Sequence, residues 1–226
     1  MNTVPTVADT KRAFLQAFPH PISAIYRKII DELLVELHLL TVDQAFRYDC
    51  VFALGTVTIF EQFMEGYRGD KEPLWEALIR AVRLDPHQIK QDAQRVLDLV
   101  AQYPQAVEKL LVSLEAEVDL SPLDAHLRAI ASNTRFKYSR LFAVGLYTMI
   151  AKLTAEEEKR TELLQLSCQA LYPHGQQENS QHRAADRFLR DLDIYRSNLE
   201  KVQQTKQMMA DLVEAERKKK AKLSSA

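Results

Sequence analysis

The sequence predicts an all-α protein, and three observations support this prediction. Only five glycines occur in 226 residues, and no Asn-Gly or Asp-Gly dipeptide is present, so tight β-hairpin turns lack their usual residues. The eight prolines avoid the long apolar runs and fall where helices could begin or end. Apolar side chains recur mostly every three or four residues, as on a helix that buries one face. We therefore expect a compact multi-helix bundle with a long, heptad-patterned C-terminal helix that partly projects.

The first two helices are indicated by a cap and a break. Thr6 and Asp9 have the spacing of a capping box, and a short helix over 10–18 should end at Pro19 and Pro21. A longer helix follows from Ile22, with one apolar face formed by Ile25, Ile29, Ile30, Leu33, Leu34, Leu37 and Leu40. We expect this face to be the inner one, with Arg27, Lys28, Asp31 and Glu32 mostly off it.

The third helix carries the first copy of a repeat. The segment 46–58, FRYDCVFALGTVT, recurs in altered form at 136–148 as FKYSRLFAVGLYT. Two segments seldom match this well unless they share an ancestor or a packing role, so we expect paired, pseudo-symmetric core helices over about 49–67 and 135–153. The identical pairs that define this structural repeat are Phe46/Phe136, Tyr48/Tyr138, Phe52/Phe142, Ala53/Ala143, Gly55/Gly145 and Thr58/Thr148.

The two repeat glycines predict where the copies meet. Glycine inside a helix costs about 1 kcal/mol relative to alanine. Gly55 and Gly145 are therefore explained if each lets a neighbouring helix approach closely. A capping box of Thr41 and Gln44 should precede the first copy, and Gly66 should end it.

Short helices connect the two copies, and their starts carry helix caps. Asp70, Asp85 with Pro86, and Pro104 each predict a helix start. Ser121 and Pro122 predict another start, for a helix ending near Ala131. After the second copy, a capping box is expected at Thr154 and Glu157, and the helix that follows should end near Tyr172 and Pro173.

The C-terminal region shows a different period. From Ala185 the apolar positions alternate steps of four and three, which is the heptad pattern of a helix that packs along a seam. We expect a bundle domain over 1–182, a helix over 183–217 that docks on the bundle to about Val202, and a basic disordered tail over 218–226. The seam residues are Phe188, Leu192, Tyr195, Leu199, Val202, Lys206, Met209, Val213 and Glu216.

Composition and motifs exclude several functions. Lys and Arg number 30 against 31 Asp and Glu, so no overall charge attracts nucleic acid. No histidine follows a glutamate by three residues, and phosphate-binding loops, G-x-S-x-G and C-x-x-C motifs are absent. Cys50 and Cys168 fit buried thiols in a reducing compartment. The uncharged runs are shorter than the ~20 residues of a spanning helix. We expect no enzyme, metal, cofactor or transmembrane segment.

Two parts of the C-terminal helix are candidate binding surfaces. An apolar patch with one lysine is the candidate partner-binding surface, although ordinary packing within the molecule would also explain it: Lys206, Met208, Met209, Leu212 and Val213. A basic cluster is the candidate contact with anionic lipid headgroups, although a solubilising helix end would also explain it: Arg217, Lys218, Lys219, Lys220 and Lys222. The same helix could pair with a second copy of the chain.

Four motifs in order resemble a known family. They are VADTKRAF, PISAIYRKIIDELLVELHLL, the FALG helix that closes in FEQFMEGY, and FKYSRLFAVGLYT. Together they resemble the thylakoid formation protein family, the photosystem II biogenesis factors of cyanobacteria and chloroplasts. No transit peptide precedes the motifs, so the chain is similar to a cyanobacterial member or a mature form.

The resemblance implies a function that the composition does not. It implies an all-helical accessory protein without enzymatic activity, peripherally associated with the cytoplasmic or stromal side of the thylakoid membrane. It also implies a link to FtsH-type membrane proteases, and so to assembly and repair of photosystem II. The leading hypothesis is an adaptor that binds and stabilises such a protease. The alternatives are a membrane organiser that acts through the basic helix end, and a helical enzyme or pigment binder.

Overall fold

The computed structural model describes the backbone of residues 4–172 and 178–224, with side chains except at 178–184, 209–210 and 212–224. This part of the chain contains helices and no strand, which confirms the predicted all-α class. The helices are α1 (Val7–Ala17), α2 (Ala24–Thr41), α3 (Cys50–Phe63), α4 (Lys71–Ala81), α5 (Pro86–Gln102), α6 (Pro104–Ser113), α7 (Leu123–Ser132), α8 (Arg140–Leu153), α9 (Glu157–Leu171) and α10 (Glu178–Ser224).

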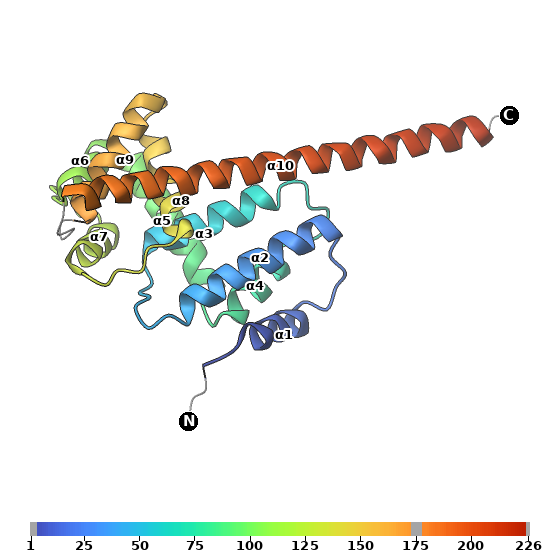
Figure 1. Cartoon of the computed structure of the whole chain (residues 1–226), viewed down its shortest axis with the longest axis horizontal. Helices are drawn as coiled ribbons and strands as arrows, with labels where there is room; N and C mark the ends of the chain where they lie inside the picture. Colours follow the sequence, from blue (N-terminus) through green and yellow to red (C-terminus); the bar gives the residue numbers. More distant parts are fainter. Residues whose placement is uncertain (1–3, 173–177, 225–226) are drawn as a thin grey trace.

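Helices α3 and α8 form the centre of the bundle, as the repeat predicted. Helix α3 packs against both α8 and α5, while α1, α2 and α4 pack together beside them. Helices α6, α7 and α9 gather at the other end of the bundle, and α10 lies across the body and continues past it (Figure 1). The largest fully buried side chains include Trp75, Phe14, Phe52, Phe60, Phe142 and Phe188.

The two repeat glycines lie at the crossing of α3 and α8. A Cβ atom on Gly55 would lie 1.7 Å from the carbonyl oxygen of Leu141, and one on Gly145 would lie 2.0 Å from that of Val51. No side chain fits at such distances, so each glycine admits the backbone of the other helix. The expectation of a close helix approach is confirmed.

Three of the predicted helix starts have the expected caps. Thr6 and Asp9 form a complete capping box at α1. Asp70 accepts a hydrogen bond from the backbone of α4, and Asp85 accepts two from the first turn of α5. Each cap satisfies backbone N–H groups that have no partner inside the helix, which fixes where the helix begins.

The capping box expected before α3 is wrong. Thr41 is the last residue of α2, and its hydroxyl donates to the Leu37 carbonyl oxygen at 2.9 Å instead of capping a helix with Gln44. The N-cap of α3 is Asp49, whose carboxylate accepts from the Phe52 N–H at 2.7 Å. The helix therefore begins only after this cap, and residues 46–49 before it belong to no helix.

Two further caps also differ from expectation. Thr154 and Glu157 form no capping box, since the Thr154 hydroxyl reaches only the Glu156 N–H, at 3.2 Å, and Glu156 is the N-cap of α9. Pro122 is the N-cap of α7 and makes no side-chain cap bond, so Ser121 does not cap that helix either. Neither helix start therefore has a side-chain cap.

Several helix boundaries are shorter or longer than predicted. Helix α3 ends at Phe63 and the chain turns at Gly66, which has the positive φ of 75° that glycine tolerates. Helix α8 starts at Arg140 instead of near 135. The backbone of α10 is helical over Glu178–Ser224, beyond both ends of the predicted 183–217.

Candidate interaction surfaces

The first half of α10 is held on the bundle by an apolar seam. Phe188, Leu192 and Tyr195 are buried, and Leu199 and Val202 are partly buried against the same core. The rings of Phe188 and Phe142 meet edge to face, so α10 packs directly on the second copy of the repeat. The seam residues that the heptad pattern selected between 188 and 202 thus face the bundle.

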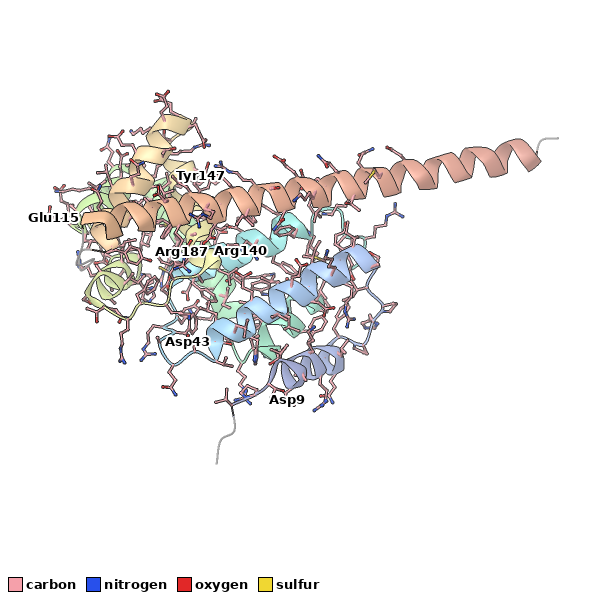
Figure 2. The ribbon with its side chains drawn as sticks, viewed as in Figure 1. Asp9, Asp43, Glu115, Arg140, Tyr147 and Arg187 are labelled. Atoms are coloured by element: carbon pink, nitrogen blue, oxygen red, sulfur yellow. The ribbon has the colours of Figure 1, made fainter. Side chains whose placement is uncertain are left out.

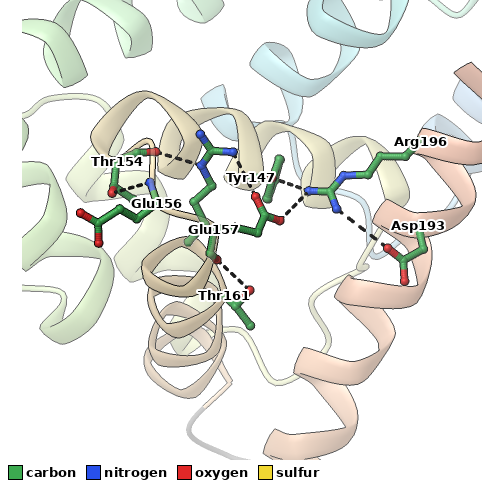
Figure 3. Close-up of polar contacts among 8 residues, drawn as sticks. Tyr147, Thr154, Glu156, Glu157, Thr161, Asp193 and Arg196 are labelled. Atoms are coloured by element: carbon green, nitrogen blue, oxygen red, sulfur yellow. Dashed lines mark hydrogen bonds and ion pairs between the residues drawn. The ribbon is translucent and has the colours of Figure 1, made fainter. Parts of the chain in front are cut away.

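A polar cluster ties the same half of α10 to α8 and α9. Arg196 of α10 donates to the hydroxyl oxygen of Tyr147 and to the carboxylate of Glu157, the latter at 3.3 Å (Figure 3). Its guanidinium carbon lies 4.8 Å from the centroid of the Tyr147 ring, within the range of a cation–π contact. One arginine therefore connects three helices at the surface of the bundle.

Lys206 marks the point where α10 leaves the body. Its Nζ donates to the carbonyl oxygens of Phe63 and Glu65, at 2.9 and 2.6 Å, and lies 5.0 Å from the centroid of the Tyr26 ring. The hydroxyl of Tyr26 donates to the same Glu65 carbonyl at 3.1 Å. A cation at carbonyls that follow the end of α3 is favourable because those groups lack helical partners. Burial of the ammonium lowers the pKa of Lys206.

The candidate partner-binding residues do not share one environment. Lys206 donates to carbonyl oxygens within the molecule, whereas Met208 is 58% exposed. The side chains of Met209, Leu212 and Val213 lie outside the described part of the structure, although the backbone there is helical. The same holds for the candidate lipid contacts Arg217, Lys218, Lys219, Lys220 and Lys222.

The two copies of the repeat use their tyrosines alike. The Tyr48 hydroxyl donates to Asp92 of α5, and the Tyr138 hydroxyl donates to Asp191 of α10, both at 2.6 Å. Each tyrosine therefore ties its copy to a different neighbouring helix. The tyrosines were identified from the repeat, but neither aspartate was. Each aspartate is far along the chain from its tyrosine, so no local sequence pattern links the two.

Other repeat residues also have equivalent places. Phe46 meets Phe52 edge to face at a centroid distance of 5.2 Å, and Phe136 meets Phe142 in the same way at 5.1 Å. The hydroxyl of Thr148 donates to the backbone carbonyl of its own helix one turn earlier. The remaining repeat threonine, Thr58, is partly buried. These contacts are internal and structural.

The N-caps of the two copies differ in charge. Asp49 caps α3 and the equivalent Ser139 caps α8, each accepting from the N–H three residues later. Burial raises the pKa of Asp49 to about 7. Beside it, the Cys50 N–H donates to Nδ1 of His126, and burial lowers the pKa of that imidazole. Asp49 and Cys50 are buried and His126 is partly buried, and the described residues contain no cluster of potential metal ligands.

The chain matches the family described as Thylakoid formation protein over residues 6–224. The chain belongs to the thylakoid formation protein family. A relative in the family, Protein Thf1 of Cyanothece sp., is 45% identical over 97% of this chain and 92% of its own length. Protein Thf1 of Nostoc sp. is 42% identical over 97% of this chain and 93% of its own length.

A solved structure agrees with the family assignment. The structure of Psb29 superimposes with a TM-score of 0.75 at 39% identity, covering 96% of this chain and 99% of that one. The family resemblance expected from the four motifs is confirmed, together with the general role that it implied in thylakoid formation and photosystem II biogenesis. Among the described residues, no helix of this family member is both long and apolar enough to span a bilayer.

Proposed function

We propose that the protein is a non-enzymatic adaptor of photosystem II biogenesis and repair, which binds and stabilises a membrane-anchored FtsH-type protease. The observation that carries this proposal is the free end of α10. The helix is fixed to the bundle up to Lys206 and continues to Ser224, about 27 Å further at ~1.5 Å per residue. A helix that projects from a rigid body presents a surface to a partner without disturbing the body's own packing.

The location of the protein is part of the same proposal. It associates peripherally with the cytoplasmic or stromal side of the thylakoid membrane, where the protease would hold it. The proposed protease link comes from the family resemblance, and the structure contributes the arm that would reach the partner.

Co-purification tests the adaptor function. A full-length tagged protein should retain the FtsH-type protease from mildly solubilised thylakoids, whereas a form ending at Lys206 should retain at least tenfold less. The shortened form keeps the Lys206 contacts to α3 and should therefore melt at nearly the same temperature as the full chain. A deletion strain should also contain less protease.

Two results would refute the proposal. One is full-length protein that retains no protease under conditions where the membrane complex stays intact. The other is retention that is equal for the two forms, which would mean that the free end of α10 is not the binding surface. Unchanged protease levels in the deletion strain would argue against stabilisation.

A peripheral membrane organiser is the second candidate, favoured by the basic cluster Arg217, Lys218, Lys219, Lys220 and Lys222 near the free end of α10. Basic residues near an anionic surface contribute about 1 kcal/mol each. Flotation should then carry the protein with anionic vesicles and leave it behind with neutral ones. Replacing Lys218, Lys219 and Lys220 by glutamine should abolish flotation, and binding that is indifferent to these charges would exclude the mechanism.

A further inference from the structure

A groove of about 1010 Å³ lies on the bundle between α2, the start of α8 and the docked half of α10. One face of α2 lines it over the whole helix, through Ala24, Lys28, Asp31, Val35 and Leu39. These residues are spaced by three and four positions, so they form a continuous stripe along the helix. The groove is therefore about as long as α2, whose 18 residues span about 27 Å.

The floor of the groove contains apolar side chains that the bundle leaves uncovered. Leu39 is 57% exposed, and Val35, one turn earlier on the same face, is only partly buried. The opposite face of α2 is buried in the core, including Leu33, Leu34 and Leu37. Leu39 and Val35 thus form a second, outward apolar strip on a helix that already buries its main one.

Most charged side chains that line the groove are paired within the molecule, including Arg27 with Asp31 and Lys28 with Glu32 on α2 itself. Lys137 pairs with Asp43 at 2.8 Å, and Arg140 pairs with Glu36, which joins α8 to α2. Among the residues that the structure describes, Lys11 forms no ion pair. The same is true of Arg187 within this part of the chain.

Arg187 is held in place for binding. Its guanidinium carbon lies 4.5 Å from the centroid of the Tyr138 ring, and the Tyr138 hydroxyl is fixed by its hydrogen bond to Asp191. Figure 2 labels Arg187 of α10 and Arg140 of α8, and both line the groove. Stacking restricts the arginine side chain before any ligand arrives, which lowers the entropy cost of binding a carboxylate.

We propose that this groove binds an amphipathic helix of a partner protein, with an apolar stripe on Val35 and Leu39 and carboxylates that pair with Lys11 and Arg187. The inference rests on the proposed adaptor function only in requiring a protein partner, and it assigns a second surface, separate from the free end of α10. An amphipathic helix binds such a groove through apolar residues at positions i, i+3, i+4 and i+7.

Charge decides between this occupant and a second copy of the chain. One segment of a second copy that could enter the groove is the projecting end of α10, whose last turns carry Arg217, Lys218, Lys219, Lys220 and Lys222. These cations would approach Lys11 and Arg187, and like charges oppose binding. An acidic partner helix would meet these two cations with opposite charge. Three of the acidic residues in the lining, Asp31, Glu32 and Glu36, already pair with Arg27, Lys28 and Arg140.

The test uses the full-length protein and two fluorescent 18-residue helical peptides of designed sequence. Both carry leucine at spacings of three and four, and one has glutamate on both flanks of the stripe where the other has lysine. By fluorescence anisotropy the acidic peptide should bind at least tenfold more tightly than the basic one. Its affinity should fall as salt is raised, because the pairs are at the surface.

Substitutions locate the binding. Leu39→Glu and Arg187→Glu should each weaken the acidic peptide at least tenfold. Val112→Glu, at an exposed apolar side chain of α6 away from the groove, is the matched control and should leave affinity unchanged. Leu39→Ser replaces Leu39→Glu if the latter alters the melting temperature, since it removes the apolar contact without adding charge.

Three outcomes would overturn the inference. The first is equal binding of the two peptides, and the second is unchanged affinity in both the Leu39 and Arg187 variants. The third is a dimer in sedimentation that Leu39→Glu converts to monomer, since the groove would then be an interface between copies. Groove-dependent peptide binding together with failed protease co-purification would refute the protease proposal and leave this inference standing.

Discussion

The two copies of the repeat have the same internal geometry but different neighbours. In each, a phenylalanine pair meets edge to face, a polar N-cap starts the helix, and a tyrosine donates to an aspartate. Tyr48 binds the buried Asp92 of α5, inside the bundle, whereas Tyr138 binds Asp191 of α10 at the edge of the surface groove. The first copy thus binds a helix inside the bundle, and the second copy binds α10, the helix that projects from it.

Substitution of the glycines where α3 and α8 cross should reduce stability most, and by the same amount in both copies. Gly55→Ala or Gly145→Ala places a Cβ against a backbone carbonyl at about 2 Å, which only separation of α3 and α8 can relieve. We expect a loss of roughly 4 kcal/mol or more in the free energy of unfolding, measured by urea denaturation.

Gly69→Ala is the control for this pair. The atoms nearest to the added Cβ there belong to the ring of Tyr67, a side chain that can rotate where a backbone carbonyl cannot, so the cost should stay below ~1 kcal/mol. Unchanged stability in both Gly55→Ala and Gly145→Ala would show that α3 and α8 are not in contact at these residues.

The N-cap of α3 should make the stability of the protein depend on pH, whereas the N-cap of α8 should not. The pKa of Asp49 is about 7 in the folded protein against 3.8 ordinarily, so the folded state binds a proton that the unfolded state releases. Stability due to this group is present below pH 3.8 and is lost as pH rises to about 7. At ~1.4 kcal/mol per unit, the loss is up to roughly 4 kcal/mol.

Asp49→Ser copies the cap of α8 and should remove this pH dependence. The variant should gain stability over the parent as pH rises from 4 to 8, by roughly 3 kcal/mol, in urea denaturation at each pH. His126 is present in both proteins, so its own titration largely cancels in the difference. A constant difference across this range would mean that the carboxyl of Asp49 is hydrated and not buried.

Substitutions of the two tyrosines should have the smallest effect on stability, and the effect should differ between the two copies. Tyr48→Phe leaves the nearly buried carboxylate of Asp92 with Gln88 as its remaining side-chain partner, which should cost about 2 kcal/mol. Tyr138→Phe leaves Asp191 where water can replace the hydroxyl, so the cost should be below ~1 kcal/mol. Thermal unfolding of the two variants measures the difference, and equal costs would contradict the proposed inside–outside distinction.

The sequence predicted those features that depend on neighbours along the chain. The Thr6 capping box and the caps at Asp70 and Asp85 are local, and the structure contains them. The contact between Gly55 and Gly145 was predictable despite their separation along the chain. Glycine destabilises a helix, so its presence at the same position in both copies of the repeat indicates a close approach of the two helices. The repeat alignment also contained the correct caps of its helices, Asp49 and Ser139, at equivalent positions.

Features that depend on distant parts of the chain were not predictable. The Thr41 hydroxyl donates within its own helix because Thr41 is the last residue of α2, and the cap of the next helix is the more distant Asp49. The groove combines Lys11, α2, the start of α8 and Arg187, and only the folded arrangement brings them together. The contact of Lys206 with α3 likewise joins residues more than 140 positions apart.

The crossing of α3 and α8 also constrains how the protein folds. Its two glycines are 90 residues apart, so the central contact must close a long loop before it contributes stability, which slows folding. During synthesis, α3 leaves the ribosome well before its partner exists and exposes the apolar residues that α8 later covers. We expect the nascent chain to remain protease-sensitive until about residue 153 has emerged, and then to become resistant in one cooperative step.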